Sequence, residues 1–173
     1  QKEEHQSYSV YEQAQRYRAA KVVLQDIYAL DAEHAEAVKA LEQLWAEGYT
    51  VAAHQLGKFY RDDLSTLRDH EKAEQWFRCS AEAGNDFSEY ALGKLLITQK
   101  RTVEALEWLD KAADHGSQFA RYRLGKIYLV GESVPKDTEK ALAYLTASAD
   151  QGNQFAQYTL GKLYLLGRDV PPD

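Results

Sequence analysis

The side chains that could act as nucleophiles or metal ligands are few and scattered in this sequence. The five histidines are His5, His34, His54, His70 and His115. No two of them have the i, i+4 spacing at which one face of a helix holds a metal ion. The single cysteine, Cys79, has no evident histidine partner, and glycine-rich phosphate loops are absent. We therefore expect no enzymatic activity, no metal site and no cofactor in this chain.

Four lysines have the most regular spacing of all the charged residues, because each ends a copy of the tripeptide Leu-Gly-Lys. They are Lys58, Lys94, Lys126 and Lys162. Such a row of ammonium groups could bind an acidic or extended segment of another protein. The simpler alternative is that each lysine lies over apolar surface and pairs with a nearby carboxylate. Both alternatives depend on the helices that carry the lysines.

The tripeptide belongs to an internal repeat, which is best identified before any single element is assigned. Its glycines, at positions 57, 93, 125 and 161, are 36, 32 and 36 residues apart. A second glycine series, at positions 48, 84, 116 and 152, has the same intervals. Aromatic residues form matching columns, namely Phe87, Phe119 and Phe155, then Tyr90, Tyr122 and Tyr158, and Trp76, Trp108 and Tyr144. These coincident columns indicate an array of related repeats.

Each repeat is predicted to contain two helices, which we call helix A and helix B. Residues 86–97 have the apolar spacing of a helix A, and residues 71–83 have that of a helix B. The second glycine series ends helix B, because glycine accepts a positive φ without steric cost. The glycine inside helix A costs roughly 1 kcal/mol relative to alanine, so we expect the next helix backbone to approach it closely. The aromatic columns are expected to form the core.

The loop between helices A and B and the two ends of the chain give further evidence for how the repeats are organised. Pro135 stops helix A, and Asp137 is placed to cap helix B. Asp173 has the same place one repeat later, so the last repeat is expected to be truncated. Residues 8–29 are predicted to form a long helix without the tripeptide. We therefore divide the chain into an N-terminal helix region, 1–33, which is a degenerate first repeat or a cap, and an array of about four repeats, 34–173.

Composition excludes several classes of function. The formal net charge of −6 over 173 residues argues against sequence-independent nucleic-acid binding. No apolar run approaches the roughly 20 residues of a membrane span, so we expect no membrane contact. A single cysteine cannot form an intramolecular disulfide, which favours a reduced, cytoplasmic protein. The chain has no methionine, and we expect it to be a piece of a longer protein.

The repeat resembles the Sel1-like repeat, a relative of the tetratricopeptide repeat. The best copy contains Lys140-Ala141, Gln151-Gly152-Asn153 and the run Leu160-Gly161-Lys162-Leu163-Tyr164. The loop at residues 61–67 departs from the usual Gly-x-x-Val-Pro pattern of the family. The resemblance implies an all-α fold, a right-handed α-solenoid of stacked antiparallel helix pairs. It also implies a non-catalytic scaffold for protein partners, with helix A on the concave side.

A finer resemblance concerns residues 122–126, 134–137 and 157–167. Their sequence is similar to that of the repeat tail of mobilisation relaxases from Gram-positive gut bacteria. That resemblance implies an accessory C-terminal region of a plasmid or transposon relaxase, whose catalytic DNA-nicking domain lies outside this chain. It assigns no chemistry to these residues.

The lysine row and its variable neighbours on helix A form the hypothesis for a partner-binding groove. Its members are Lys58, Lys94, Lys126, Lys162, Gln55, Glu89, Arg121, Arg123, Gln157 and Thr159. The expected partner is a protein or peptide segment that is acidic or extended.

Overall fold

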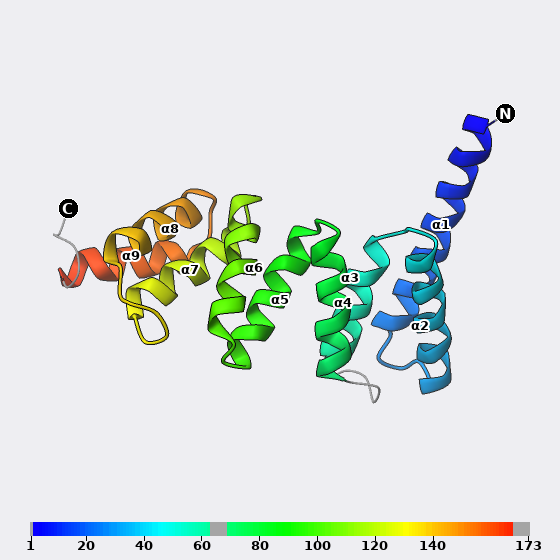
Figure 1. The fold of residues 1–173 in the computed structure, drawn as a ribbon, viewed down its shortest axis with the longest axis horizontal. Coiled ribbons are helices and arrows are strands. Elements are labelled where there is room, and N and C mark those ends of the chain that lie inside the picture. Colours follow the sequence, from blue (N-terminus) through cyan, green and yellow to red (C-terminus); the bar gives the residue numbers. More distant parts are fainter. Residues whose placement is uncertain (1, 63–68, 168–173) are drawn as a thin grey trace. The chain divides into compact units, whose positions relative to one another are not determined.

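The computed structural model describes residues 2–62 and 69–167, and side chains from residue 9 onward. Within these ranges the chain forms helices and no strand (Figure 1), so the all-α prediction is confirmed. The helices are α1 (Lys2–Gln25), α2 (Asp31–Ala46), α3 (Val51–Arg61), α4 (His70–Glu82), α5 (Asp86–Thr98), α6 (Thr102–Asp114), α7 (Gln118–Val130), α8 (Thr138–Asp150) and α9 (Gln154–Leu166). None of the described helices combines the length and hydropathy that a membrane span requires.

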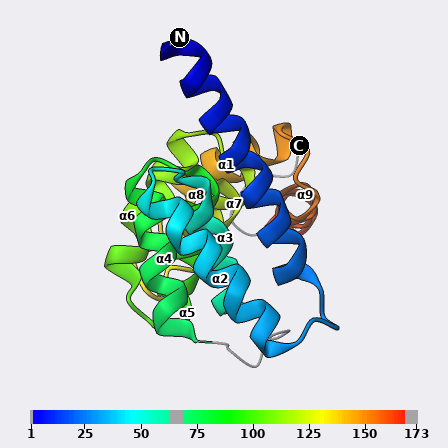
Figure 2. The same ribbon diagram turned by 90° about the vertical axis from the view of Figure 1, so that its right-hand side faces the viewer.

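The chain consists of two compact halves, the N-terminal half Gln1–Ser88 and the C-terminal half Glu89–Asp173. In the N-terminal half, α1 packs on α2, α2 on α3, and α3 on α4 (Figures 1 and 2). In the C-terminal half, α6 packs on α7, α7 on α8, and α8 on α9. Helices α3, α5, α7 and α9 are the predicted A helices, and α2, α4, α6 and α8 are the B helices.

The helices begin and end where local side chains satisfy the backbone. The Asp137 carboxylate accepts a hydrogen bond from the Lys140 backbone N–H at 3.0 Å, which confirms the predicted cap of α8. Asp69 caps α4 in the same way. At the ends of the B helices, Gly84 and Gly152 have φ values of 92° and 96°, as expected for a glycine-specific stop. The boundaries predicted for α4 and α5 are correct to within one residue.

Three of the glycines inside the A helices lie against an apolar side chain of the next B helix: Gly57 against Phe77, Gly93 against Leu109, and Gly125 against Leu145. A Cβ atom built on Gly125 would lie 2.6 Å from Leu145 Cγ and 3.2 Å from the Ala141 carbonyl oxygen. The predicted close approach is therefore confirmed, although the nearest atoms belong to a side chain. Gly161 differs, because a Cβ there would meet nothing within 4 Å.

The prediction that all the aromatic columns form the core is wrong for the phenylalanines and for Tyr158. Phe119 is 49% exposed, Phe155 68% and Tyr158 71%, and Phe87 is exposed as well. The reason is their angular position on the helix. Phe119 and Phe155 each precede a fully buried alanine, and Phe87 precedes the fully buried Ser88. One residue turns a helix by about 100°, so the core face is already filled by these small residues and by leucines.

The N-terminal helix is also placed differently from the prediction, since it ends at Gln25 and not at residue 29. The Asp26 carboxylate accepts a hydrogen bond from the Tyr28 backbone N–H at 2.9 Å and holds the turn that follows the helix. Ile27, expected on the apolar helix face, is exposed. The boundary between 1–33 and 34–173 stays a prediction, and both the cap at Asp173 and most of the loop 61–67 lie outside the described residues.

Candidate functional site

The four lysines of the predicted row are carried by four different A helices. Lys58 is half-buried on α3 in the N-terminal half. Lys94 and Lys126 are half-buried on α5 and α7, and Lys162 is exposed on α9, all in the C-terminal half. The three lysines of the C-terminal half thus occupy the same position on three A helices.

Lys94 is held by an aromatic ring. Its Nζ atom lies 5.3 Å from the centre of the Tyr90 ring, a cation–π distance. Arg123 approaches the same tyrosine from α7, and its Nε–H donates to the Tyr90 hydroxyl at 3.3 Å. For Lys126 and Lys162, no carboxylate of the described residues lies within ion-pair distance. The simpler alternative requires each lysine to lie over apolar surface and to pair with a carboxylate. Lys94 meets the first condition, and Lys126 and Lys162 do not meet the second.

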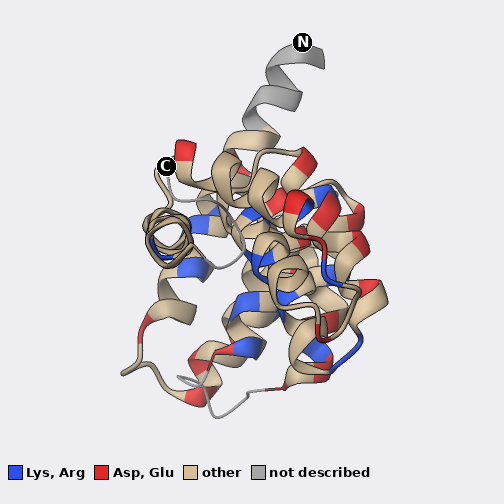
Figure 3. Ribbon diagram, turned by 90° about the vertical axis from the view of Figure 1, so that its left-hand side faces the viewer, with Lys and Arg blue, Asp and Glu red and all other residues tan. Residues whose placement is uncertain are grey.

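Charge is divided between the two kinds of helix in the C-terminal half. Helix α7 carries three cations, Arg121, Arg123 and Lys126, and no acidic residue, while α9 carries Lys162 and no acidic residue. Helix α6 carries four acidic residues and one lysine, and α8 carries two acidic residues and one lysine. Figure 3 colours these charges on the ribbon. Helices α7 and α9 are therefore basic in a chain whose net charge is −6.

Three residues of the predicted groove are buried, which corrects the expectation that they belong to an accessible surface. They are Gln55, Glu89 and Thr159. Thr159 uses its hydroxyl to donate to the Phe155 carbonyl oxygen at 2.8 Å within its own helix. Glu89 is 1% exposed, and one of its carboxylate oxygens lies 2.7 Å from His115 Nδ1. The side chains of these three residues are therefore largely inaccessible to a partner.

The His115–Glu89 contact joins the end of α6 to α5. His115 is the C-cap residue of α6 and its imidazole is largely exposed, whereas the Glu89 carboxylate is buried. The sequence places His115 at a helix C-terminus, where positive charge is favourable, but it does not show the carboxylate 26 residues away. The contact has a structural role, because it supplies a hydrogen bond to a buried carboxylate.

Arg121 and Gln157 bond to the ends of neighbouring B helices. The Arg121 guanidinium donates to the Gln151 side-chain carbonyl at 2.8 Å. The Gln157 amide donates to the Ala149 carbonyl oxygen at 3.1 Å. Both side chains are therefore oriented by the fold while they remain at least partly accessible.

A feature that the sequence did not predict is a row of ring pairs on the A helices, in which a partly buried tyrosine contacts an exposed phenylalanine. In the C-terminal half, the Tyr90 and Phe119 rings lie 5.8 Å apart, and the Tyr122 and Phe155 rings 5.9 Å apart. Each pair joins the tyrosine of one A helix to the phenylalanine of the next. The phenylalanine column is one residue out of step with Ser88, Ala120 and Ala156, but the sequence does not show which of the two columns is buried.

In the N-terminal half, His54 occupies the column position of these tyrosines. Its Nδ1 lies 2.6 Å from Ser88 Oγ, and Ser88 Oγ donates to Ser80 Oγ at 2.7 Å. Burial lowers the pKa of His54 to about 4, with smaller contributions from Lys58 and Arg61. Ser88 is fully buried and its proton is directed to Ser80, so this serine–histidine pair lacks both the access and the proton direction of a nucleophile with its base.

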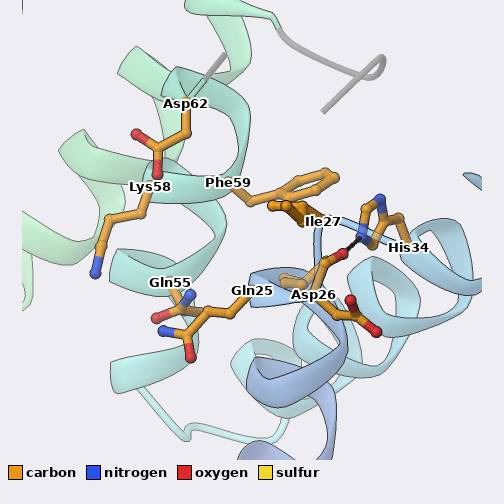
Figure 4. A pocket seen from close by; sticks show the side chains of 9 residues that line it. Gln25, Asp26, Ile27, His34, Gln55, Lys58, Phe59 and Asp62 are labelled. Carbon is orange, nitrogen blue, oxygen red and sulfur yellow. Dashed lines mark hydrogen bonds between the residues drawn. The ribbon is translucent and has the colours of Figure 1, made fainter. Parts of the chain in front are cut away.

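A small cavity in the N-terminal half includes two residues of the predicted set, Lys58 and Gln55 (Figure 4). Its other lining residues are Leu24, Gln25, Asp26, Ile27, His34, Phe59 and Asp62. His34 Nε2 lies 3.0 Å from the Asp26 carbonyl oxygen at its edge. The volume is about 60 Å³, which holds a few water molecules or a small polar group. The cavity is too small for an organic cofactor.

The described residues assemble no set of three histidine, cysteine or acidic side chains that could hold a metal ion. Cys79 is half-buried on α4. Burial, with a smaller effect from Glu82, raises the pKa of its thiol. A raised pKa keeps the thiol protonated near neutral pH and therefore disfavours its use as a nucleophile.

The repeat pattern matches a known family over most of its length. The Sel1 repeat profile matches residues 50–85, 88–117, 118–153 and 154–173. This chain belongs to the Sel1 repeat family. The matched segments cover well over half of the chain and contain all four copies of the Leu-Gly-Lys tripeptide.

Solved structures show the same fold. A protective antigen of uropathogenic Escherichia coli, c5321, is 26% identical over 93% of this chain and 35% of its own, with a TM-score of 0.80. A Sel1 repeat protein from Oxalobacter formigenes is 29% identical over 93% of this chain and 67% of its own, with a TM-score of 0.77. The immunity protein Pa5087 from Pseudomonas aeruginosa is 25% identical over 88% of this chain and 58% of its own, with a TM-score of 0.58.

The chain therefore has the fold of a Sel1-like α-solenoid, as the sequence resemblance implied. It spans about a third of the length of the E. coli protein. No protein with a curated description matches this chain.

Proposed function

We propose that this Sel1 repeat chain is a non-catalytic scaffold that binds an acidic, extended segment of a protein partner on its A helices. Sel1 repeat proteins generally act as protein-interaction scaffolds. The observation that carries the finer proposal is the charge division in the C-terminal half, where α7 and α9 carry four cations and no acidic residue. The members that contact the partner are Lys94, Lys126, Lys162, Arg121, Arg123 and Gln157, all in the C-terminal half, and Lys58 is the corresponding lysine of the N-terminal half.

The proposed mode of binding uses a surface whose side chains are already oriented. Tyr90 holds Lys94 and Arg123, and Gln151 holds Arg121. Oriented cations lose less side-chain entropy when a partner binds. A basic surface also attracts an acidic segment before contact, so the association rate should fall as ionic strength rises.

The test is a pull-down with the whole chain and two charge-matched variants, from extracts of the cells that make it. The first variant is Lys94→Glu with Lys126→Glu, on A helices. The control is Lys39→Glu with Lys111→Glu, on the B helices α2 and α6, which changes the net charge equally. The proposal expects a protein retained by the original chain and the control but lost by the A-helix variant. Equal retention by all three would overturn the proposal.

The second candidate function is that of an accessory region of a relaxase. The sequence similarity at residues 122–126, 134–137 and 157–167 is more specific than the repeat pattern alone. In that case the chain positions other transfer proteins while a separate domain cuts DNA. Reading the gene upstream of Gln1 tests it. A relaxase domain there would support it, and the absence of one would overturn it.

We also propose a cytoplasmic location, because the single cysteine is free and proteins without disulfides are typical of reducing compartments. Fractionation of the source cells tests this, and recovery from an oxidising compartment would contradict it.

A further inference from the structure

The C-terminal half exposes three large aromatic rings on adjacent A helices. Phe119 lies on α7, and Phe155 and Tyr158 lie on α9, with about half to three quarters of each residue exposed. Exposed single apolar residues are ordinary, but rings gathered on one kind of helix and repeated at a fixed interval are a mark of an interaction surface.

These rings are ordered, because two of them stack against a tyrosine of the preceding A helix. The centre-to-centre distances are 5.8 Å for Tyr90 and Phe119 and 5.9 Å for Tyr122 and Phe155, with tilted planes. Such distances are those of favourable aromatic pairs. A ring that is already fixed binds an apolar group without a further loss of side-chain entropy.

The core does not require phenylalanine at these positions. The buried face of α7 is filled by Ala120 and Leu124, which are fully buried, whereas Phe119 contacts the partly buried Tyr90 ring of α5 and leaves about half of its own surface exposed. A polar side chain would be less costly in water and could occupy the same first turn of the helix. The aromatic column therefore points to a ligand.

Cations flank the ring pairs. Lys94 and Arg123 both contact Tyr90, and Arg121 lies on the same helix as Phe119. This combination suits a segment that carries apolar side chains and carboxylates in alternation. A second copy of the same surface is a poor occupant, because α7 and α9 would then face cations with cations. A nucleic acid is also disfavoured, since the chain as a whole has a charge of −6.

We infer that the ring pairs Tyr90–Phe119 and Tyr122–Phe155, with Tyr158, bind the apolar side chains of an extended acidic peptide. The inference rests on the proposed scaffold function and specifies the chemistry of its partner. Packed helices lie about 8–10 Å apart, and an extended segment rises about 3.3 Å per residue. Consecutive ring pairs therefore meet about every third residue of the peptide, and carboxylates between them reach the lysines and arginines.

The experiment selects binders from a displayed library of random twelve-residue peptides on the full 173-residue chain. An enriched peptide is then labelled with fluorescein, and its affinity is measured by anisotropy. The variants are Phe119→Ser with Phe155→Ser, the reversal Lys94→Glu with Lys126→Glu, and the control Val103→Ser. Val103 is 79% exposed on the B helix α6, so its replacement removes exposed apolar surface away from the rings.

The expected peptides contain acidic residues and apolar residues about three positions apart. The phenylalanine variant should weaken binding by about tenfold or more, and Val103→Ser should leave it unchanged. Circular dichroism should show both variants folded, because the replaced side chains are exposed.

Each contrary outcome has a distinct meaning. Loss of binding in the lysine reversal with full binding in the phenylalanine variant would overturn this inference and leave the scaffold function standing. Full binding in both variants, or no enriched peptide, would overturn both. Phenylalanine-dependent dimerisation in sedimentation, or tighter binding of a twelve-nucleotide oligothymidylate than of any peptide, would overturn the inference in favour of a second copy or a single-stranded nucleic acid.

Discussion

The A helices of the C-terminal half present two faces whose residues recur with the same interval but have opposite environments. Ala120 and Leu124 of α7 are fully buried against the neighbouring helices, whereas Phe119, beside Ala120 in the sequence, is half exposed. The buried columns stabilise the stack of helices. The exposed columns, which contain aromatic and basic side chains, lie at the surface of that stack and contact it through ring pairs such as Tyr90–Phe119. Recurrence alone therefore does not distinguish packing from binding, but recurrence together with exposure does.

The glycine of the Leu-Gly-Lys tripeptide also has different environments in different repeats. Gly125 in α7 lies under Leu145 of the following helix, and Gly161 in α9 has open space where its Cβ would be. The glycine is therefore required by the side chain that covers it and not by its own helix. Changes at covered and open positions should have opposite effects on stability.

The largest expected effect is at Leu145, the fully buried side chain that covers Gly125. Leu145→Ala should lower the free energy of unfolding by about 2–5 kcal/mol, because it removes apolar contacts and leaves a cavity. Urea denaturation followed by circular dichroism measures this loss. Leu165→Ala is the matched control, since Leu165 is 84% exposed, and it should change stability by less than about 0.5 kcal/mol. Similar losses for both would contradict the assignment of buried and exposed faces.

The next effect is at Gly125 itself. Gly125→Ala places a Cβ 2.6 Å from Leu145 Cγ, and we expect the resulting overpacking to cost about 1–3 kcal/mol. The same denaturation assay measures it. Combining Gly125→Ala with Leu145→Ala should destabilise the chain by less than the sum of the single changes, because the cavity accepts the new methyl group. Strict additivity would show that the two residues do not contact each other as described.

A smaller effect of opposite sign is expected at Gly161. Gly161→Ala adds a methyl group in open space and restores helix propensity, so it should stabilise the chain by about 0.5–1 kcal/mol. The urea midpoint should rise. A fall in the midpoint would show that something covers this glycine in solution, and sedimentation at two concentrations would then identify a second copy.

The remaining effect depends on pH and concerns His54, which occupies the column of Tyr90 and Tyr122 in the other half. Its pKa of about 4 lies below its ordinary value of 6.5, so between these pH values the unfolded chain binds more protons than the folded one. Stability contributed by neutral His54 is thus complete above about pH 6.5 and is lost as the pH falls toward 4. His54→Tyr should reduce the slope of stability against pH in that window. An unchanged slope in urea titrations would contradict the assignment.

Much of the fold could be predicted because the signals are local. The positive φ of Gly84, the cap at Asp137 and the spacing of apolar residues in α5 are each decided within a few residues. Exposure of Phe119 and burial of Glu89 could not be predicted in the same way. Both depend on which face of the helix the next helices cover, and Glu89 also depends on His115 at the far end of α6. The row of lysines could be predicted from the sequence, whereas the aromatic rings beside it were predicted to lie in the core.

The central claim is that a partner docks on the A helices of the C-terminal half, and a photochemical contact map tests it most directly. One variant carries p-benzoylphenylalanine in place of Phe155 on α9, and the other carries it in place of Val103 on α6; both side chains are exposed. Each is expressed in the source cells and irradiated, and its adducts are identified by mass spectrometry. The account predicts a specific partner adduct at position 155 and none at position 103. An adduct at position 103 alone, or equal adducts at both positions, would contradict it.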